Sequence, residues 1–384
     1  MFQTVIVKLT SFCNLDCDYC YMFNLTDKTY LEMPKQMKSD IACTIVDKVI
    51  EYLNSEGKSE FHFCLHGGEP TLWPEESFAT LLGKIYDYNL AGYSLSVSIQ
   101  TNLYSLPCNN ILNLLRSNNI KLGVSLDGPQ HYHDRHRFTR NRQGTYSKII
   151  TNLRRLEKQG YSDLFGGFLC VANPDIPPQE FWNWAKKLPI TNLDILWPIQ
   201  FNQANPPWIN DSKHEYSISP SYGVWFAEIF ELWWNEDEPL FFVRLFDNLV
   251  KIFLAGNKIS HVDSLVNDQL NMFVVNVDGS IEYPDYLRAA EGGSISTGLS
   301  ICSDCISDFS QDSVFSRLFN LNSCLPNECH ACPFQEVCGG GFLPGRSMPG
   351  GIISDMKSVM CHDQYYFFEH VFDLINKRIN MACP

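Results

Sequence analysis

Basic residues are scarce in this sequence. Its 29 Lys and Arg residues face 43 Asp and Glu residues, which gives a formal net charge of −14 at pH 7 and a pI near 5.1. A protein that binds nucleic acid neutralises phosphates with a basic surface. This balance therefore argues against a nucleic-acid partner, and a neutral or cationic substrate is easier to accommodate.

Export and membrane signals are also missing. The N-terminus, MFQTVIVKLTSFC, has no basic segment followed by an apolar one. No apolar run in the chain approaches the length of about 18 residues that a membrane span needs. The sequence therefore predicts a cytoplasmic protein without a membrane partner.

Cysteine, in contrast, is plentiful. Without an export signal, the 15 cysteines predict reduced thiols that bind metal rather than disulfides. Eight of them fall between Cys302 and Cys383. Four others stand singly in mostly apolar surroundings and are expected to be buried small hydrophobes, namely Cys43, Cys64, Cys108 and Cys170.

The first three cysteines form a compact motif. Cys13, Cys17 and Cys20 are spaced as C-x3-C-x2-C, directly after the apolar run Val5–Leu9. A [4Fe–4S] cluster that only carries electrons takes four thiolates, so three would leave one iron open for a substrate or cofactor. The alternatives are a zinc knuckle, although the second ligand pair of a zinc site is missing nearby, and a chance cluster of thiols.

The rest of the chain predicts an α/β fold. Strand-like runs alternate with helical stretches at residues 5–9, 61–65, 95–100, 121–125, 167–172 and 193–197. Such alternation is typical of parallel β/α units, which right-handed crossovers wind into a partial barrel with functional residues at the carboxyl ends of the strands. We therefore expect a partial (β/α)6 barrel followed by a small cysteine-rich α+β domain.

Composition suggests the boundaries of these parts. The barrel is predicted over residues 1–205 and, after a Pro- and Asn-rich connection, a helical bridge over 206–265 and the cysteine-rich domain over 266–384. The bridge should contain helices at 222–234 and 241–254, whose Phe and Trp side chains are expected to pack between domains, with a peptide groove as the alternative. The last domain should contain a hairpin turning at Asp278-Gly279 and a helix near 365–375.

The three-cysteine motif and three later segments together resemble the radical S-adenosylmethionine (SAM) family. The later segments are GGEP at 67–70, IQTN at 99–102 and SLDGP at 125–129, and a basic stretch around Arg137 follows them. The resemblance implies a cluster that binds SAM at its open iron, and it implies the following SAM contacts: Gly67, Gly68, Glu69, Gln100, Asn102, Ser125, Asp127 and Arg137. Leu103 replaces the glycine that the family usually has after Asn102. Without the resemblance, these polar residues would be interpreted as turn caps, and Arg137 as part of a solvated loop.

A second cysteine set lies near the C-terminus. Cys329, Cys332 and Cys338 are spaced as C-x2-C-x5-C and Cys361 follows, which together offer the four thiolates of an electron-transfer cluster or of a zinc ribbon. The set resembles the SPASM domain of radical SAM peptide maturases, which implies at least one auxiliary [4Fe–4S] cluster.

This second set departs from the SPASM pattern in two places. Phe342 stands at the place of the fourth cysteine, and Pro284-Asp285 stands at that of another ligand. We therefore expect a first auxiliary cluster to be absent or rebuilt. Cys302, Cys305 and Cys324 have no assigned role, so a further cluster bound by them is an open alternative.

The segments DGSIEYPDYL and CGGGFLPGRS resemble the FxsB-like, three-residue cyclophane-forming branch of these maturases. The resemblance implies that a 5′-deoxyadenosyl radical starts an oxidative crosslink between an aromatic ring and a nearby Cβ of a ribosomal precursor peptide. It also implies a flavodoxin or ferredoxin as electron donor. We assign Asp285 as a speculative proton acceptor, with a plain turn carboxylate as the competing interpretation.

Other functions remain open. SPASM-type enzymes also form thioethers, excise or epimerise residues, and generate formylglycine in sulfatases. A non-catalytic metal-binding scaffold is the alternative of another class.

Overall fold

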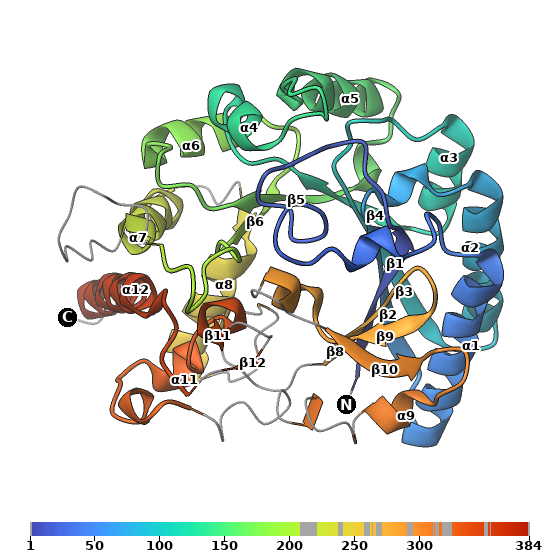
Figure 1. Ribbon diagram of the computed structural model, residues 1–384. Helices are drawn as coiled ribbons and strands as arrows, with labels where there is room; N and C mark the ends of the chain where they lie inside the picture. The colour runs from blue at the N-terminus through green and yellow to red at the C-terminus, as the bar shows by residue number, and fades with distance from the viewer. Residues whose placement is uncertain are drawn as a thin grey trace.

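The computed structural model describes residues 2–207, 221–236, 241–256, 262, 264–265, 271–289, 295–309, 311, 315–316, 325–348, 352–353 and 355–382. Within these residues one curved sheet of ten strands organises the molecule (Figure 1). The strands lie in the order β10-β9-β8-β1-β2-β3-β4-β5-β6-β7. This arrangement is the predicted α/β fold with a partial barrel.

The strands from β8 through β1 to β7 run parallel to their neighbours, whereas β9 and β10 are antiparallel. The six predicted barrel strands are all present, and β7 and β10 are additions. The bounds are β1 (Thr4–Thr10), β2 (Glu60–Gly67), β3 (Ser94–Thr101), β4 (Lys121–Ser125), β5 (Phe165–Val171), β6 (Asn192–Leu196), β7 (Phe242–Val243), β8 (Met272–Val275), β9 (Ser280–Glu282) and β10 (Ser296–Ser300).

Helices cover the outside of the sheet (Figure 1). Parallel strands need crossover connections, and these are made by α1 (Ser39–Glu56), α2 (Glu75–Leu90), α3 (Asn109–Ser117), α4 (Gln130–His136), α5 (Tyr146–Lys158) and α6 (Pro178–Ala185). The later helices are α7 (Ser221–Trp234), α8 (Arg244–Ala255), α9 (Ile306–Phe309), α11 (Gln335–Cys338) and α12 (Cys361–Ala382). A small second sheet pairs β11 (Ser347–Met348) with β12 (Ile352–Ile353).

The predicted hairpin is present, and it extends the barrel sheet. Its strands β8 and β9 are joined by a turn in which Gly279 has a φ of +91° and donates its N–H to the carbonyl of Asn276. Strand β8 pairs with β1, with Phe273 opposite Val5. The division at residues 205 and 265 stays a prediction, and residues 208–220 of the predicted connection lie outside the described part.

Aromatic side chains of α7 pack against the neighbouring helices, as expected for a bridge. The rings of Phe226 and Phe367 lie 5.4 Å apart between α7 and α12, and those of Phe230 and Phe246 lie 5.2 Å apart between α7 and α8. All four side chains are buried. They are packing residues and do not line a peptide groove.

The single cysteines differ in their surroundings. Cys170 is buried as predicted, and Cys43 is partly buried. Cys108 is exposed just before α3, so its predicted burial is wrong. Cys64 is on β2 and lines the central cavity described below.

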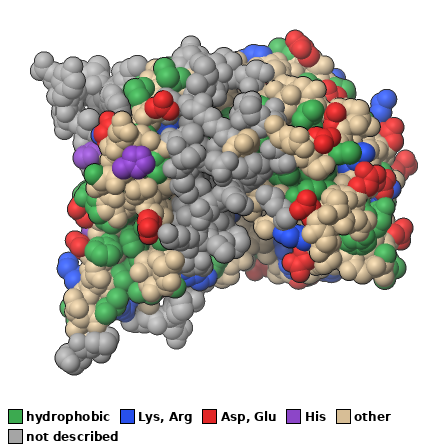
Figure 2. Space-filling model, turned by 90° about the horizontal axis from the view of Figure 1, so that it is seen from below, with side chains coloured by type: hydrophobic (Ala, Val, Ile, Leu, Met, Phe, Trp, Pro, Cys, Tyr) green, Lys and Arg blue, Asp and Glu red, His purple; other side chains and the backbone are tan. Residues whose placement is uncertain are grey.

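None of the described helices is long and apolar enough to span a membrane. On the face seen in Figure 2, acidic side chains are interspersed with basic ones over the described surface.

Candidate active site and auxiliary cysteine site

A cavity of about 420 Å³ lies at the carboxyl ends of the barrel strands. Its walls include the residues predicted to hold the first cluster and SAM, namely Cys13, Cys17, Cys20, Gly67, Gly68, Glu69, Gln100, Asn102, Ser125, Asp127 and Arg137. Asp285 lines the same cavity. The fold therefore brings together predicted site residues as far apart in sequence as Cys13 and Asp285.

Two glycines allow the end of β2 to lie against the cysteine loop. A Cβ on Gly68 would lie 2.0 Å from the carbonyl oxygen of Phe12, and one on Gly67 would lie 2.6 Å from that of Thr10. In their place are backbone hydrogen bonds, from Gly68 N to Thr10 O (2.8 Å) and from Glu69 N to Phe12 O (3.1 Å). Only glycine permits this approach.

The three thiols of the loop are buried together. Burial raises the pKa of Cys13 to about 12 and that of Cys17 to about 11, and it also raises the pKa of Cys20. The charges of the neighbouring thiols raise the pKa of Cys13 further. Ionising these thiols requires cations among them, and sulfur donors in this number suit the irons of a cluster.

Glu69 joins the GGEP turn to the end of β3. Its Oε1 accepts hydrogen bonds from the hydroxyls of Thr71 (2.6 Å) and Thr101 (2.7 Å), and its Oε2 accepts one from Asn102 N (2.8 Å). A carboxylate oxygen has room for a second donor. Glu69 Oε2 therefore fits the predicted contact with the SAM amine while the carboxylate braces the turn.

Asn102 contacts the cysteine loop directly. Its Nδ2 lies 3.4 Å from Cys13 Sγ and donates to Asn14 Oδ1 at 2.9 Å, and its Oδ1 accepts from Tyr104 N at 2.8 Å. The next residue, Leu103, is fully buried with a φ of +51°. The turn thus forms without the family glycine, because contacts around Asn102 hold Leu103 in the left-handed region.

Arg137 is a buried cation of the cavity wall, so its interpretation as part of a solvated loop is wrong. Its Nη1 donates to Tyr19 OH (2.8 Å) and lies 3.8 Å from Asp127 Oδ2, to which Tyr19 OH also donates. Asp127 Oδ1 accepts from Val171 N at 3.1 Å. On β3 and β4, Gln100 Nε2 donates to Ser125 Oγ at 3.1 Å.

Asp285 lines the same cavity from a position directly after the hairpin. Its Oδ2 accepts hydrogen bonds from Lys8 Nζ and from Tyr21 OH, the latter at 2.8 Å. Lys8 Nζ also lies 3.2 Å from His66 Nδ1. Although burial raises it, the pKa of Asp285 lies well below its usual value because of the charge of Lys8. Asp285 is therefore ionised although it is buried, and this distinguishes it from an exposed turn carboxylate.

Sequence analysis missed Lys8, Tyr21 and His66 as members of this network. Burial and the charge of Lys8 lower the pKa of His66 to about 3, so the ring is neutral. Lys8 is fully buried in β1. A lysine within an apolar, β-branched strand was the available signal, because lysine is almost never fully buried without a partner.

The family model of the radical SAM superfamily matches residues 7–188. These residues belong to the radical SAM superfamily. The protein is thus a radical SAM enzyme, with the predicted cofactor pair of a [4Fe–4S] cluster and SAM, and the matched region ends just before β6.

Known proteins resemble the chain over nearly its whole length. A cysteine-type anaerobic sulfatase-maturating enzyme of Clostridium novyi is 26% identical, over 95% of this chain and 94% of that protein. A serine-type anaerobic sulfatase-maturating enzyme of Bacteroides thetaiotaomicron is 25% identical, over 99% and 93%. The structure of native anSMEcpe with bound AdoMet and Cp18Cys peptide matches with a TM-score of 0.81 at 22% identity, over 99% and 100%. The last likeness confirms the fold, and none of the three supports the predicted cyclophane-forming branch.

In this radical SAM enzyme the C-terminal cysteines form a second site. Cys338 ends α11 and Cys361 begins α12. Burial raises the pKa of Cys338 to about 12, and the charges of Cys361, Cys329 and Cys332 raise it further. The four predicted ligands therefore lie within electrostatic range of one another.

An amide beside the second site lacks a protein partner. Gln364 is 1% exposed, and neither its Oε1 nor its Nε2 has a hydrogen-bond partner among the described residues. A Cβ on Gly341, in the loop after Cys338, would lie 2.8 Å from this Oε1. Gln364 lies one helical turn after Cys361, so both side chains are on one side of α12. A buried amide needs a partner, and the sulfur atoms of a cluster fit the donor Nε2.

An aromatic ring, that of Phe342, occupies one of the two places where the SPASM pattern changes. Phe342 packs on Tyr286 with ring centroids 5.3 Å apart, and both line the central cavity. Cys302 and Cys305 are exposed, and Cys324 lies outside the described residues. Within those residues, no three His, Cys, Asp or Glu side chains are close enough to bind one single metal ion, whereas the thiolates of a [4Fe–4S] cluster each bind a different iron.

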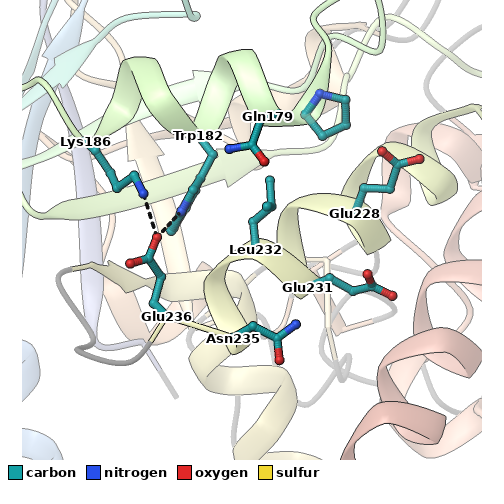
Figure 3. A pocket seen from close by; sticks show the side chains of 9 residues that line it. Gln179, Trp182, Lys186, Glu228, Glu231, Leu232, Asn235 and Glu236 are labelled. Carbon is teal, nitrogen blue, oxygen red and sulfur yellow. Dashed lines mark hydrogen bonds and ion pairs between the residues drawn. The ribbon is translucent and has the colours of Figure 1, made fainter.

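A second hollow, of about 560 Å³, lies between α6 and α7 (Figure 3). In it Glu236 Oε1 accepts from Trp182 Nε1 (2.7 Å) and from Lys186 Nζ (2.9 Å). None of the predicted site residues lines it.

Proposed function

We propose that this enzyme oxidises a cysteine or serine of a bound polypeptide to formylglycine, as in sulfatase maturation. This proposal is supported by the similarity of this chain to a cysteine-type and a serine-type sulfatase-maturating enzyme, which extends over nearly the full length of each. This reaction is one of the alternatives that the sequence left open. The structural observation that carries it is that the three thiols and the Asp285 carboxylate line one cavity.

The enzyme's residues have complementary roles in this proposal. Cys13, Cys17 and Cys20 would hold the SAM-binding cluster, which when loaded supplies a hydrogen-abstracting 5′-deoxyadenosyl radical. Cys329, Cys332, Cys338 and Cys361 would hold the auxiliary cluster, which supplies an electron acceptor. Glu69, Arg137 and Asp127 would orient SAM through its amine and carboxylate.

Asp285 is the proposed proton acceptor. Oxidation of the side chain removes one hydrogen atom, one proton and one electron, and the proton leaves the substrate hydroxyl or thiol for Asp285 Oδ2. Lys8 keeps this carboxylate free of a proton before the reaction, and Tyr21 fixes its orientation. A serine then yields the aldehyde directly. A cysteine yields a thioaldehyde, which water converts to the aldehyde with release of hydrogen sulfide.

The substrate partner is proposed to be a polypeptide segment that enters the cavity, and a flavodoxin or ferredoxin is proposed as the source of electrons. The predicted cyclophane crosslink is the competing reaction. The cyclophane-forming branch was predicted from the two segments that contain Asp285 and Phe342. Membership of that branch would explain why these residues replace cysteines of the SPASM pattern.

Mass spectrometry and aldehyde trapping separate the two reactions. The enzyme is incubated anaerobically with SAM, a reductant and sulfatase-derived peptides that carry Cys, Ser or Ala at one position. Formylglycine formation predicts a product that reacts with a hydrazide probe, from the Cys or Ser peptide and not from the Ala peptide. Loss of two hydrogens without hydrazide reactivity, from a peptide with an aromatic residue, would favour the crosslink. The Cys13/Cys17/Cys20 triple-alanine variant is the control.

A further inference from the structure

A buried arginine lies beside the four C-terminal thiols. Arg346 is 0% exposed and ends the short 3-10 helix Leu343–Arg346, which follows the glycine loop after Cys338. A Cβ on Gly340 would lie 3.0 Å from Arg346 Nη1. The guanidinium is therefore held against the backbone of the loop that carries Cys338.

The charge of Arg346 reaches the thiol site. Gly340, beside which the guanidinium of Arg346 lies, comes two residues after Cys338 in the same loop, and Lys357 comes four residues before Cys361. Lys357 is exposed. Water and salt screen the charge of an exposed side chain, whereas a buried charge acts at a lower effective dielectric constant.

The barrel side of the molecule fixes this arginine in place. From the segment after β6, Gln203 N donates to Ser347 O (3.0 Å) and Gln203 Nε2 donates to Gly345 O (2.9 Å). Val359 N also donates to Gly345 O at 2.9 Å. Both neighbours of Arg346 are thus anchored, so its cation is preorganised and does not have to move when the charge beside it changes.

A [4Fe–4S] cluster held by four thiolates is an anion, and its reduction adds one more negative charge. A fixed cation nearby stabilises the reduced form more than the oxidised form, which raises the reduction potential. We propose that Arg346 is a positioning residue that sets the reduction potential of the auxiliary cluster. The cluster can then accept the electron that the substrate radical gives up. This inference rests on the ligand assignment in the proposed function.

The test is a redox titration of the anaerobic, loaded enzyme, followed by electron paramagnetic resonance. The first cluster is recognised because added SAM changes its spectrum. The variants are R346M, which removes the charge, R346K, which keeps it, and K357M, which removes an exposed charge near the same thiols. We expect a more negative auxiliary potential in R346M and a smaller shift in R346K. In K357M we expect a small shift that vanishes at high salt.

Each outcome of this titration either supports or overturns the proposed role of the Arg346 charge. An unchanged auxiliary potential in loaded R346M would overturn the proposal. Loss of the auxiliary signal in R346M with retention in R346K would support a requirement for the charge. Loss in both, with a loaded K357M, would mean that Arg346 is needed for its shape, and the charge proposal would fail.

The ligand assignment is checked separately. The Cys13/Cys17/Cys20 triple-alanine variant should retain one iron–sulfur signal, and Cys338→Ala added to it should remove that signal. A triple variant without iron would sink the assignment itself. Failure of the formylglycine reaction, read from peptide mass, leaves the measured potentials unaffected.

Discussion

Lys8 on the first strand forms a buried ion pair with Asp285, which lies 277 residues later, directly after the hairpin. The pair joins the barrel to the segment that carries the proposed proton acceptor. Removing one partner leaves the other charge buried, and the cost of an uncompensated buried charge is about 3–5 kcal/mol.

A double-mutant cycle tests this pair. Lys8→Met and Asp285→Asn should each lower the free energy of unfolding by about 3–5 kcal/mol, and the double variant should lose less than either single variant. Urea denaturation under nitrogen gives the values. Additive losses would contradict the coupling. Asp285→Asn should also abolish product while SAM cleavage continues.

His66 should make stability depend on pH. Its pKa is about 3 in the folded protein and about 6.5 in an unfolded chain, so the unfolded state binds more protons between these values. Stability should therefore rise with pH up to about 6.5 and become level above it. His66→Gln should reduce the slope by up to about 1.4 kcal/mol per pH unit. Denaturation between about pH 5 and 7 measures this slope, and equal slopes in both proteins would refute the assignment.

The Cys338→Ala variant tests whether SAM cleavage can continue without product formation. Cys338→Ala removes a buried ligand of the second site and leaves the central cavity intact, so 5′-deoxyadenosine should still form while peptide oxidation stops. Liquid chromatography of the nucleoside and mass spectrometry of the peptide give both quantities. Cys108→Ala, at an exposed single cysteine, is the control. Full product formation by Cys338→Ala would remove the auxiliary cluster from the mechanism.

Gly68 and Gly83 make a matched pair of glycine substitutions. A Cβ on Gly68 would collide with the Phe12 carbonyl, whereas one on Gly83, exposed in α2, would meet nothing within 4 Å. Gly68→Ala should displace the cysteine loop and reduce bound iron. Gly83→Ala should keep the iron and stabilise the helix by about 0.5–1 kcal/mol. Iron content and thermal unfolding check both, and a fully loaded Gly68→Ala would show that the loop tolerates displacement.

Sequence alone was sufficient where a residue follows a strand directly. Cys13, Glu69 and Asn102 lie near the carboxyl ends of parallel strands, as expected, because local hydrophobic patterns locate those strands. Their contacts with a cluster and SAM stay predictions. The pairing of β8 with β1 was not accessible in this way. It joins segments far apart in sequence, and nothing in the local pattern of either strand specifies its partner.

Burial of charge could not be predicted from local composition, and only the family resemblance placed Arg137 at the SAM site. The stretch around Arg137 looks like a solvated run of charges, yet Tyr19 and Asp127 draw this one arginine into the cavity. Lys8 was overlooked for the same reason, since its partner is supplied by a distant hairpin. Local composition gives average exposure and does not identify the exception that a long-range partner stabilises.

The place of β8 beside β1 also bears on how the enzyme is made. A ribosome synthesises β1 first, but the strand that covers one of its edges, and the carboxylate that neutralises Lys8, appear only after residue 271. Until then the nascent barrel exposes an unpaired strand edge and a lysine without its counter-ion, both of which invite misassociation. Completion of the chamber around the first three cysteines is thus a late event in biosynthesis. Iron that arrived earlier would encounter these three thiols in an incomplete site that is open to water.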